Sequence, residues 1–169
     1  MNDHAGHSGP YDAPVKLATH YVQPDWIDYN GHMNVAYYTM AFDSAIDEFL
    51  EQELGMGESH AAAVNEGPYS LQNNVSYYAE LLEGAGFQIN VRLVDHDQKR
   101  MHLFMEMINE AGDLAAACEG MLMNVDHITR RSTPYANWVM ERLASMQASH
   151  NALPRPAGLG AVIGIRKKG

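Results

Sequence analysis

The sequence predicts an α+β fold made of one short strand, one long helix and a run of antiparallel strands. The helix is indicated by apolar residues that recur at steps of three and four between Val35 and Leu50. The sheet is indicated by a change of period after residue 70, where apolar and polar residues alternate. A chain of 169 residues is long enough for one domain with its own core.

Two elements are expected before the main part of the sheet. Residues 16–22 predict a short strand, in which the alternating positions are held by Val15, Leu17, Thr19 and Tyr21. The long helix follows, and its apolar stripe consists of Val35, Tyr38, Phe42, Ile46, Phe49 and Leu50. Gly55 and Gly57 come directly afterwards and predict the end of the helix.

Four further strands are predicted after a loop around Gly67 and Pro68. They cover residues 71–80, 87–93, 101–107 and 114–125. The last of them is apolar on both alternations, which is typical of a central strand covered on both faces. Residues 135–148 predict a terminal helix.

We expect a flexible leader over residues 1–14, a single domain over 15–150 and a flexible tail over 151–169. His4 and His7 in the leader are interpreted as solvated side chains rather than as metal ligands. The leader lacks the pattern of a signal peptide, and no apolar run approaches the length that spans a membrane. These observations predict a cytoplasmic protein.

Charge and cysteine content exclude several classes of function. A formal net charge of −10 argues against non-specific binding to nucleic acid or to an anionic membrane. The single cysteine, Cys118, excludes a disulfide framework and a cysteine zinc cluster. It lies in an alanine-rich segment and is interpreted as a small buried residue. No metal and no cofactor are expected.

The segment Pro24–Tyr38 carries the strongest functional signal. Asp28 precedes Asn34 by six residues, and Asn34 is a favoured N-cap residue directly before the long helix. The free N–H groups of the first helical turn can bind an anion, and the same end of a helix attracts negative charge. One short segment can therefore supply both a nucleophile or general base and an oxyanion hole.

Residues 28–37 match the pattern Asp-x-x-Gly-His-x-Asn-x-x-Tyr. This pattern resembles the signature of the 4-hydroxybenzoyl-CoA thioesterase-like acyl-CoA thioesterases, which have the hotdog fold, a curved antiparallel sheet wrapped around a long central helix. The resemblance extends over about residues 15–130. The longer form from Pro24 to Asn34 is similar to the betainyl-CoA thioesterase branch, which is associated with carnitine breakdown. The segments 95–102 and 119–121 also look like that branch.

The resemblance implies that Asp28 is the catalytic carboxylate, which either attacks the thioester carbonyl or activates a water molecule. It also implies that the backbone N–H of Val35 stabilises the oxyanion. Gly31 permits a close backbone approach that a side chain would block. His32 and Asn34 are expected to shape the loop and cap the helix, and proton transfer by His32 is the less favoured role.

Aromatic and basic residues are the candidate contacts to an acyl-CoA substrate. Aromatic faces attract a quaternary ammonium group, which suits a betainyl moiety, although ordinary packing is the alternative at each position. The aromatic candidates are Trp26, Tyr37, Tyr77 and Tyr78. The candidates for the phosphates of coenzyme A are Lys99, Arg100, Arg130 and Arg131, with solvated turn charges as the alternative.

Other functions and another set of carboxylates stay open. A hotdog hydratase or dehydratase is the second hypothesis, indicated only by His32 beside Asp28. A non-catalytic acyl-CoA-binding protein is the third, and Asp28 argues against it. Some hotdog thioesterases use a carboxylate in the central helix, so the second choice of nucleophile is among Asp43, Asp47, Glu48 and Glu51. Their pattern suggests a solvated face.

We expect two or four copies of the chain to associate. A single hotdog sheet has an exposed edge, whose free N–H and C=O groups tend to pair with another strand. Closed symmetry is the rule for homo-oligomers, which predicts a homodimer or a homotetramer.

Overall fold

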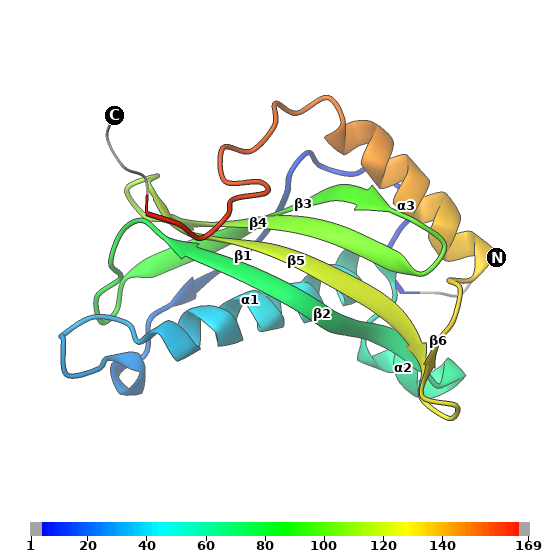
Figure 1. Cartoon of the computed structure of the whole chain (residues 1–169), viewed down its shortest axis with the longest axis horizontal. Helices are drawn as coiled ribbons and strands as arrows, with labels where there is room; N and C mark the ends of the chain where they lie inside the picture. Colours follow the sequence, from blue (N-terminus) through cyan, green and yellow to red (C-terminus); the bar gives the residue numbers. More distant parts are fainter. Residues whose placement is uncertain (1–4, 166–169) are drawn as a thin grey trace.

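The computed structural model describes residues 5–165 and contains a curved six-stranded antiparallel sheet with one long helix against its concave face (Figure 1). The strands are β1 (Val15–Tyr21), β2 (Glu66–Tyr77), β3 (Gly86–His96), β4 (Arg100–Asn109), β5 (Leu114–Asp126) and β6 (Arg131–Ser132). They are ordered β1-β3-β4-β5-β2, and β6 pairs with β5. The predicted α+β hotdog architecture is confirmed. His4 lies outside the described residues.

The long helix is where the apolar stripe predicts it. Its α-helical part, α1, covers Val35–Phe49, and a π-helical turn continues it over Leu50–Leu54. The helix ends at Gly55, whose φ of 66° is left-handed and therefore favours glycine. The other helices are a 3-10 turn (Pro24–Trp26), the short α2 (Glu58–Val64) and the terminal α3 (Asn137–His150).

The core lies between α1 and the concave face of the sheet. Phe42 and Phe49 of α1 are almost fully buried. From β4, Met101, Leu103, Met105 and Met107 are fully buried. The alternating methionines are therefore core residues. No helix among residues 5–165 is long and apolar enough to cross a membrane.

The boundaries of β2 differ from the prediction. The strand begins at Glu66, before the expected start at residue 71, and it ends at Tyr77, before the expected end at residue 80. Gly67 and Pro68 belong to the strand rather than to a loop. Proline is tolerated there because β2 is at the edge of the sheet, where a missing N–H need not remove a ladder hydrogen bond.

The opposite edge of the sheet is covered by side chains. Strand β1 pairs with β3 only as far as Val91, and α3 lies beside the rest of β3. The Leu93 N–H donates to Nδ1 of His150 at 2.9 Å, and the Gln147 amide donates to the Val94 carbonyl at 3.0 Å. On β1 itself, the Ala18 N–H donates to Glu48.

The segment after α3 crosses the face of the sheet opposite α1 (Figure 1). The Arg92 guanidinium donates to the carbonyls of residues 153 and 154. Farther along, the Asn74 amide donates to the Ala161 carbonyl, and Glu119 accepts a hydrogen bond from the Gly160 N–H. The mobility expected of residues 1–14 and 151–169 stays a prediction.

Candidate active site

A short closed loop carries Asp28 to the N-terminus of α1. Ile27 and Met33 form an isolated antiparallel bridge that closes the loop. Inside it, the Asp28 N–H donates to the His32 carbonyl at 3.1 Å, and the Gly31 N–H donates to the Asp28 carbonyl at 2.9 Å. Gly31 has a φ of +82°, so the turn itself requires glycine. A Cβ at Gly31 would touch nothing within 4 Å, so its role in substrate approach stays a prediction.

The carboxylate of Asp28 is held by two donors. Oδ1 accepts the Asn30 N–H at 2.8 Å, and Oδ2 accepts the side-chain amide of Asn34 at 3.2 Å. Asn34 also caps α1, because its Oδ1 accepts the Ala36 N–H at 2.9 Å. The same side chain thus caps the helix, as the sequence predicts, and also holds the carboxylate of Asp28.

A hollow of about 360 Å³ opens beside the first residue of α1. It is lined by His32, Met33, Val35, Tyr38, Tyr77, Tyr78, Ala79 and Glu80. The backbone N–H of Val35 has no hydrogen-bond acceptor among the described residues. A free N–H at a helix N-terminus is suited to bind an oxyanion. The Asp28 loop and the hollow therefore meet at the end of the helix.

The four aromatic candidates form two separate groups. Trp26 and Tyr37 stack on each other, with ring centroids 5.4 Å apart and planes inclined by 12°. Trp26 also lines a smaller apolar hollow of about 160 Å³ between α1, β1 and β3. Tyr77 and Tyr78 line the larger hollow beside Val35 instead. Both pairs lie near the first turn of α1, but only this second pair lines the hollow beside Val35.

Tyr38 is a lining residue that the sequence argument assigned to the core. It is buried, and its ring meets that of Tyr77 edge to face, with centroids 5.2 Å apart. Burial chiefly raises the pKa of the Tyr38 hydroxyl; a backbone hydrogen bond at Leu81 opposes this, and nearby Tyr77 and Glu80 add to it. Glu80 was missed as well, because it is the last residue of the strand predicted over residues 71–80 and belongs to no motif.

The remaining reactive candidates are engaged or buried. Nδ1 of His32 lies 3.1 Å from the Met33 carbonyl, to which it can donate. On the helix, Glu48 accepts the Ala18 N–H, and Glu51 accepts the Ser59 hydroxyl at 2.8 Å. Burial raises the pKa of the Cys118 thiol to about 12, so it is protonated at neutral pH. Among residues 5–165, no three His, Cys, Asp or Glu side chains are grouped to hold a metal ion.

The helix carboxylates Asp43 and Asp47 differ in environment. The pKa of Asp47 is raised by partial burial and by the charges of Asp43 and Glu58. Asp47 lines a groove between α1, α2 and β2, far along the helix from Asp28. Asp43 and Asp47 are nevertheless both exposed, as a solvated face requires, whereas Glu48 and Glu51 are half-buried.

The basic candidates lie at the other end of the sheet. Arg100 begins β4 opposite Met123, and Arg131 pairs with Asp126 at the end of β5. The hollow is at the opposite end, where Tyr77 pairs with Ala116. Arg130 donates to the Tyr69 hydroxyl at 3.1 Å, and Lys99 reaches Ser132. Within one chain, these groups do not converge with Asp28.

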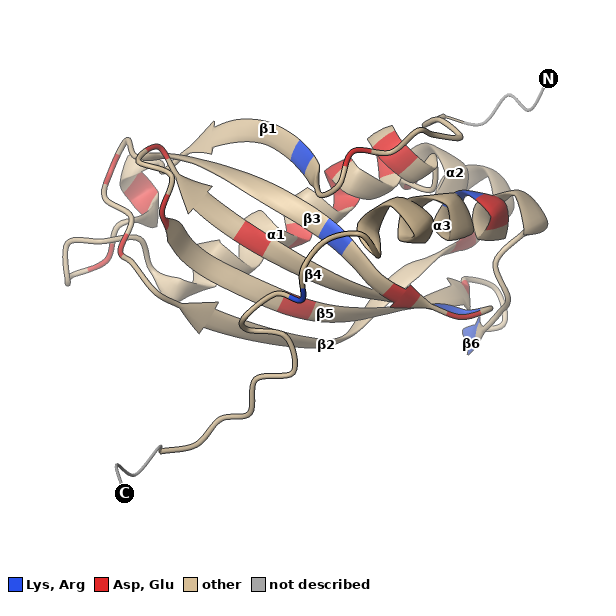
Figure 2. Ribbon diagram, turned by 90° about the horizontal axis from the view of Figure 1, so that it is seen from above, with Lys and Arg blue, Asp and Glu red and all other residues tan. Residues whose placement is uncertain are grey.

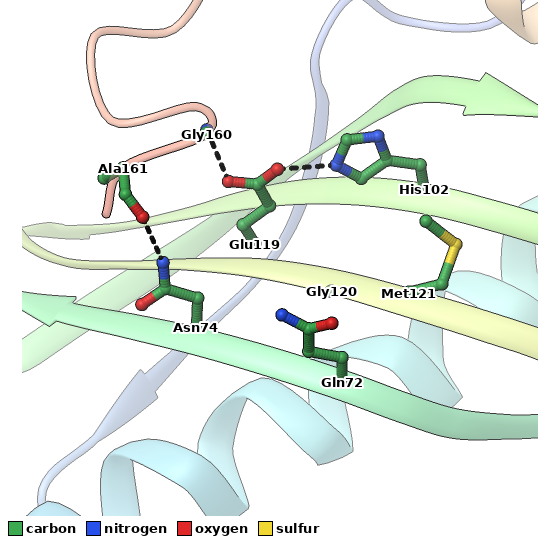
Figure 3. Close-up of a pocket in the computed structure, with 8 residues that line it drawn as sticks. All are labelled: Gln72, Asn74, His102, Glu119, Gly120, Met121, Gly160 and Ala161. Carbon is green, nitrogen blue, oxygen red and sulfur yellow. Dashed lines mark hydrogen bonds and ion pairs between the residues drawn. The ribbon is translucent and has the colours of Figure 1, made fainter. Parts of the chain in front are cut away.

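A second pocket lies on the face of the sheet opposite α1 (Figure 3). Here the structure joins two segments singled out in the sequence, because His102 Nε2 lies 2.8 Å from Glu119 Oε1. The other oxygen of Glu119 accepts the Gly160 N–H at 2.6 Å. Figure 3 shows the C-terminal segment covering this pair and Asn74. The C-terminal segment is therefore held against the sheet at the His102–Glu119 pair.

The chain and its fold have counterparts in known proteins. A family profile described as Thioesterase-like superfamily matches residues 22–143. The chain belongs to this superfamily. A betainyl-CoA thioesterase of Pseudomonas aeruginosa is 32% identical over 145 residues, which cover 85% of this chain and 91% of that protein. The predicted enzyme class, a thioester hydrolase, is confirmed by this membership.

A further relative and two solved structures are also similar to this chain over most of its length. An Agrobacterium fabrum protein named L-carnitine dehydrogenase/betainyl-CoA thioesterase is 31% identical, and the match covers 88% of this chain but 31% of that longer protein. A Staphylococcus aureus protein solved in complex with CoA has a TM-score of 0.84 and 26% identity, covering 94% of this chain and 100% of that one. A putative thioesterase from Pseudomonas putida KT2440 has a TM-score of 0.78 and 23% identity, covering 91% and 98%.

Proposed function

We propose that this thioesterase hydrolyses a short, polar acyl-CoA, with betainyl-CoA as the first substrate to test. The observation that carries the proposal is the Asp28 carboxylate, held by Asn34 at the open end of α1. Beside it, a hollow of about 360 Å³ is small for a binding pocket and suits a compact acyl group. The name of the Pseudomonas aeruginosa relative supports the betainyl group.

Asp28 acts on the thioester carbonyl in one of two ways. As a nucleophile, its oxygen bonds to the carbonyl carbon, the coenzyme A thiolate leaves, and water then cleaves the mixed anhydride. As a general base, it takes a proton from the water that attacks the carbon. In both routes the Val35 N–H stabilises the negative carbonyl oxygen, a contribution on the order of 3 kcal/mol.

We further propose that the active unit is a dimer joined along β2. This strand is at the sheet edge, and Tyr69, Leu71 and Tyr77 on it are exposed. Two β2 strands related by a two-fold axis run antiparallel, so the beginning of one lies beside the end of the other. Arg130 and Arg131 of a second copy are then brought toward the hollow, where they can bind coenzyme A phosphates.

A thiol-release assay with a panel of acyl-CoAs tests the function. We expect betainyl-CoA to be hydrolysed with a higher kcat/KM than octanoyl-CoA or palmitoyl-CoA. Preference for long acyl chains would contradict the substrate class and leave the thioesterase activity in place. Hydration of an enoyl-CoA without thiol release would favour the hydratase, and binding without turnover would favour an acyl-CoA-binding protein.

A further inference from the structure

Glu80 is the one Asp or Glu among the eight residues that line the hollow beside Val35. It follows β2 by three residues and is exposed. Among the described residues, its carboxylate makes no ion pair, because the ion pairs there involve other side chains. An uncompensated negative charge therefore lies at the rim of a pocket whose walls are largely aromatic.

Among residues 5–165, this end of the molecule carries acidic side chains but no lysine or arginine, and His32 is the one histidine that lines the hollow. In Figure 2 the end of the sheet that holds the N-terminus of α1 carries red segments and no blue ones. The described lysines and arginines are Lys16, Arg92, Lys99, Arg100, Arg130, Arg131, Arg142 and Arg155, and none of them lines the hollow. The field of Glu80 thus reaches the hollow without a described lysine or arginine among the lining residues to cancel it.

The field of Glu80 reaches the inner wall of the hollow. Its charge contributes to raising the pKa of the Tyr38 hydroxyl, after the larger effect of burial. Tyr38 in turn meets Tyr77 edge to face. A group seated on these rings is therefore within range of the Glu80 carboxylate.

This arrangement matches a particular kind of acyl group. A quaternary ammonium has no N–H, so it is held by aromatic faces and by negative charge rather than by hydrogen bonds. A negatively charged acyl group would be repelled by Glu80, and a neutral group of the same shape would gain nothing from the charge. The hollow offers both requirements of a fixed cation in one place.

We propose that Glu80 is the specificity-determining residue of this thioesterase, and that it selects acyl-CoAs whose acyl group carries a fixed positive charge. The cationic head lies against the tyrosine rings with the Glu80 carboxylate beside it. The thioester carbonyl then extends toward the N–H of Val35. This inference rests on the thioesterase function proposed above.

Two substrates of the same shape isolate the effect of charge. Betainyl-CoA and 3,3-dimethylbutanoyl-CoA differ in one atom, because a quaternary nitrogen in the first is a carbon in the second. In Glu80→Gln we expect kcat/KM for betainyl-CoA to fall by about tenfold, with the neutral substrate changed by less than about twofold. Glu83→Gln, an exposed neighbour outside the hollow, is the matched control and should change neither value.

The outcomes separate the inference from the function on which it rests. If Glu80→Gln lowers both substrates equally, or neither, Glu80 does not determine specificity, and the thioesterase proposal stands. If the wild type hydrolyses neither substrate, the substrate class in the proposed function is wrong. Tetramethylammonium binding, followed by NMR shifts of the tyrosine rings, then decides the inference: loss of binding in Glu80→Gln supports the cation site, and unchanged binding overturns it.

Discussion

Asn34 donates to Asp28 through its amide nitrogen and caps α1 through its amide oxygen. One side chain therefore links the stability of the helix start to the position of the acid. The two functions can be separated by substitution, because an aspartate at this position retains the capping oxygen and loses the donor.

We expect Asn34→Asp to keep about the stability of the wild type, because the attraction of its charge to the helix N-terminus offsets its repulsion from Asp28. The variant should lose at least tenfold in kcat, because Asp28 loses the donor that holds it. Asn34→Ala loses the cap as well and should lower the free energy of unfolding by about 1 kcal/mol. Urea denaturation and the thiol-release assay measure the two quantities. Equal stability of both variants would refute the capping role, and full activity of Asn34→Asp would refute the positioning role.

Hydrolysis should depend on the charge of Asp28. Asp28→Asn keeps the shape of the side chain and removes the negative charge, so we expect turnover to fall by about two orders of magnitude or more. Circular dichroism provides the check that the variant is folded. A folded Asp28→Asn enzyme with turnover close to that of the wild type would refute the role of Asp28. Asp47 and the other helix carboxylates would then be the next candidates for the catalytic carboxylate.

The proposed dimer predicts complementation between two defective variants. Arg130→Gln/Arg131→Gln should raise KM for acyl-CoA, since coenzyme A phosphates lose their partners. When this variant is denatured, mixed equally with Asp28→Asn and refolded together, random pairing should restore about a quarter of the wild-type sites. This happens only if each site takes Asp28 from one chain and the arginines from the other.

No recovery on mixing would show that both groups act within one chain. Light scattering gives an independent check, because the dimer should have twice the 18.8 kDa mass of one chain. A monomeric mass with full activity would contradict the dimer outright.

His150 predicts a loss of stability in mild acid. It is fully buried, its Nδ1 accepts the Leu93 N–H, and its Nε2–H donates to the Asp12 carbonyl at 2.8 Å. Burial lowers the pKa of His150 below its usual 6.5, against the opposing effect of the hydrogen bond to the Asp12 carbonyl. The unfolded chain therefore takes up a proton at a higher pH than the folded chain, and the free energy of unfolding falls as pH drops below about 6.5.

Urea denaturation at several pH values between 7.5 and 5 measures this effect. His150→Asn keeps an acceptor for Leu93 and cannot titrate, so it should be less stable by about 1–3 kcal/mol at pH 7.5 and show a shallower pH dependence. His20→Asn, at an exposed histidine, is the control and should retain the wild-type slope. If the free energy of unfolding of His150→Asn depends on pH as steeply as that of the wild type, other groups cause the loss of stability in acid.

Much of the fold follows from local patterns in the sequence. The period of α1, the alternation in β3 and β4 and the N-cap at Asn34 depend on neighbouring residues, and the structure has each of them where expected. The start of β2 cannot be predicted from neighbouring residues. Pro68 is compatible with a strand only at the edge of a sheet, and which strand forms the edge depends on the whole sheet.

The candidate site also has one part that local sequence predicts and one part that only tertiary structure assembles. The Asp28 loop is contiguous, so the sequence contains the acid, the glycine and the cap. The hollow is assembled from the Asp28 loop, from α1 and from the chain at and beyond the end of β2, so Glu80 enters only through tertiary structure. Tyr38 fits the apolar stripe of the helix equally well as a core residue, and its place on the wall of the hollow is not visible from periodicity.

The covered edge of the sheet limits how many copies can join. His150, Gln147 and Glu48 occupy backbone groups at the β1 and β3 side, whereas β2 stays open. Two copies that pair through β2 form one continuous sheet. Each outer edge of that sheet is then the β1 and β3 side of one copy, where side chains occupy backbone groups. In the proposed dimer, the open edge is used between the two copies and the remaining borders disfavour the addition of further strands, so the sheet would cross the subunit boundary without growing into a fibre.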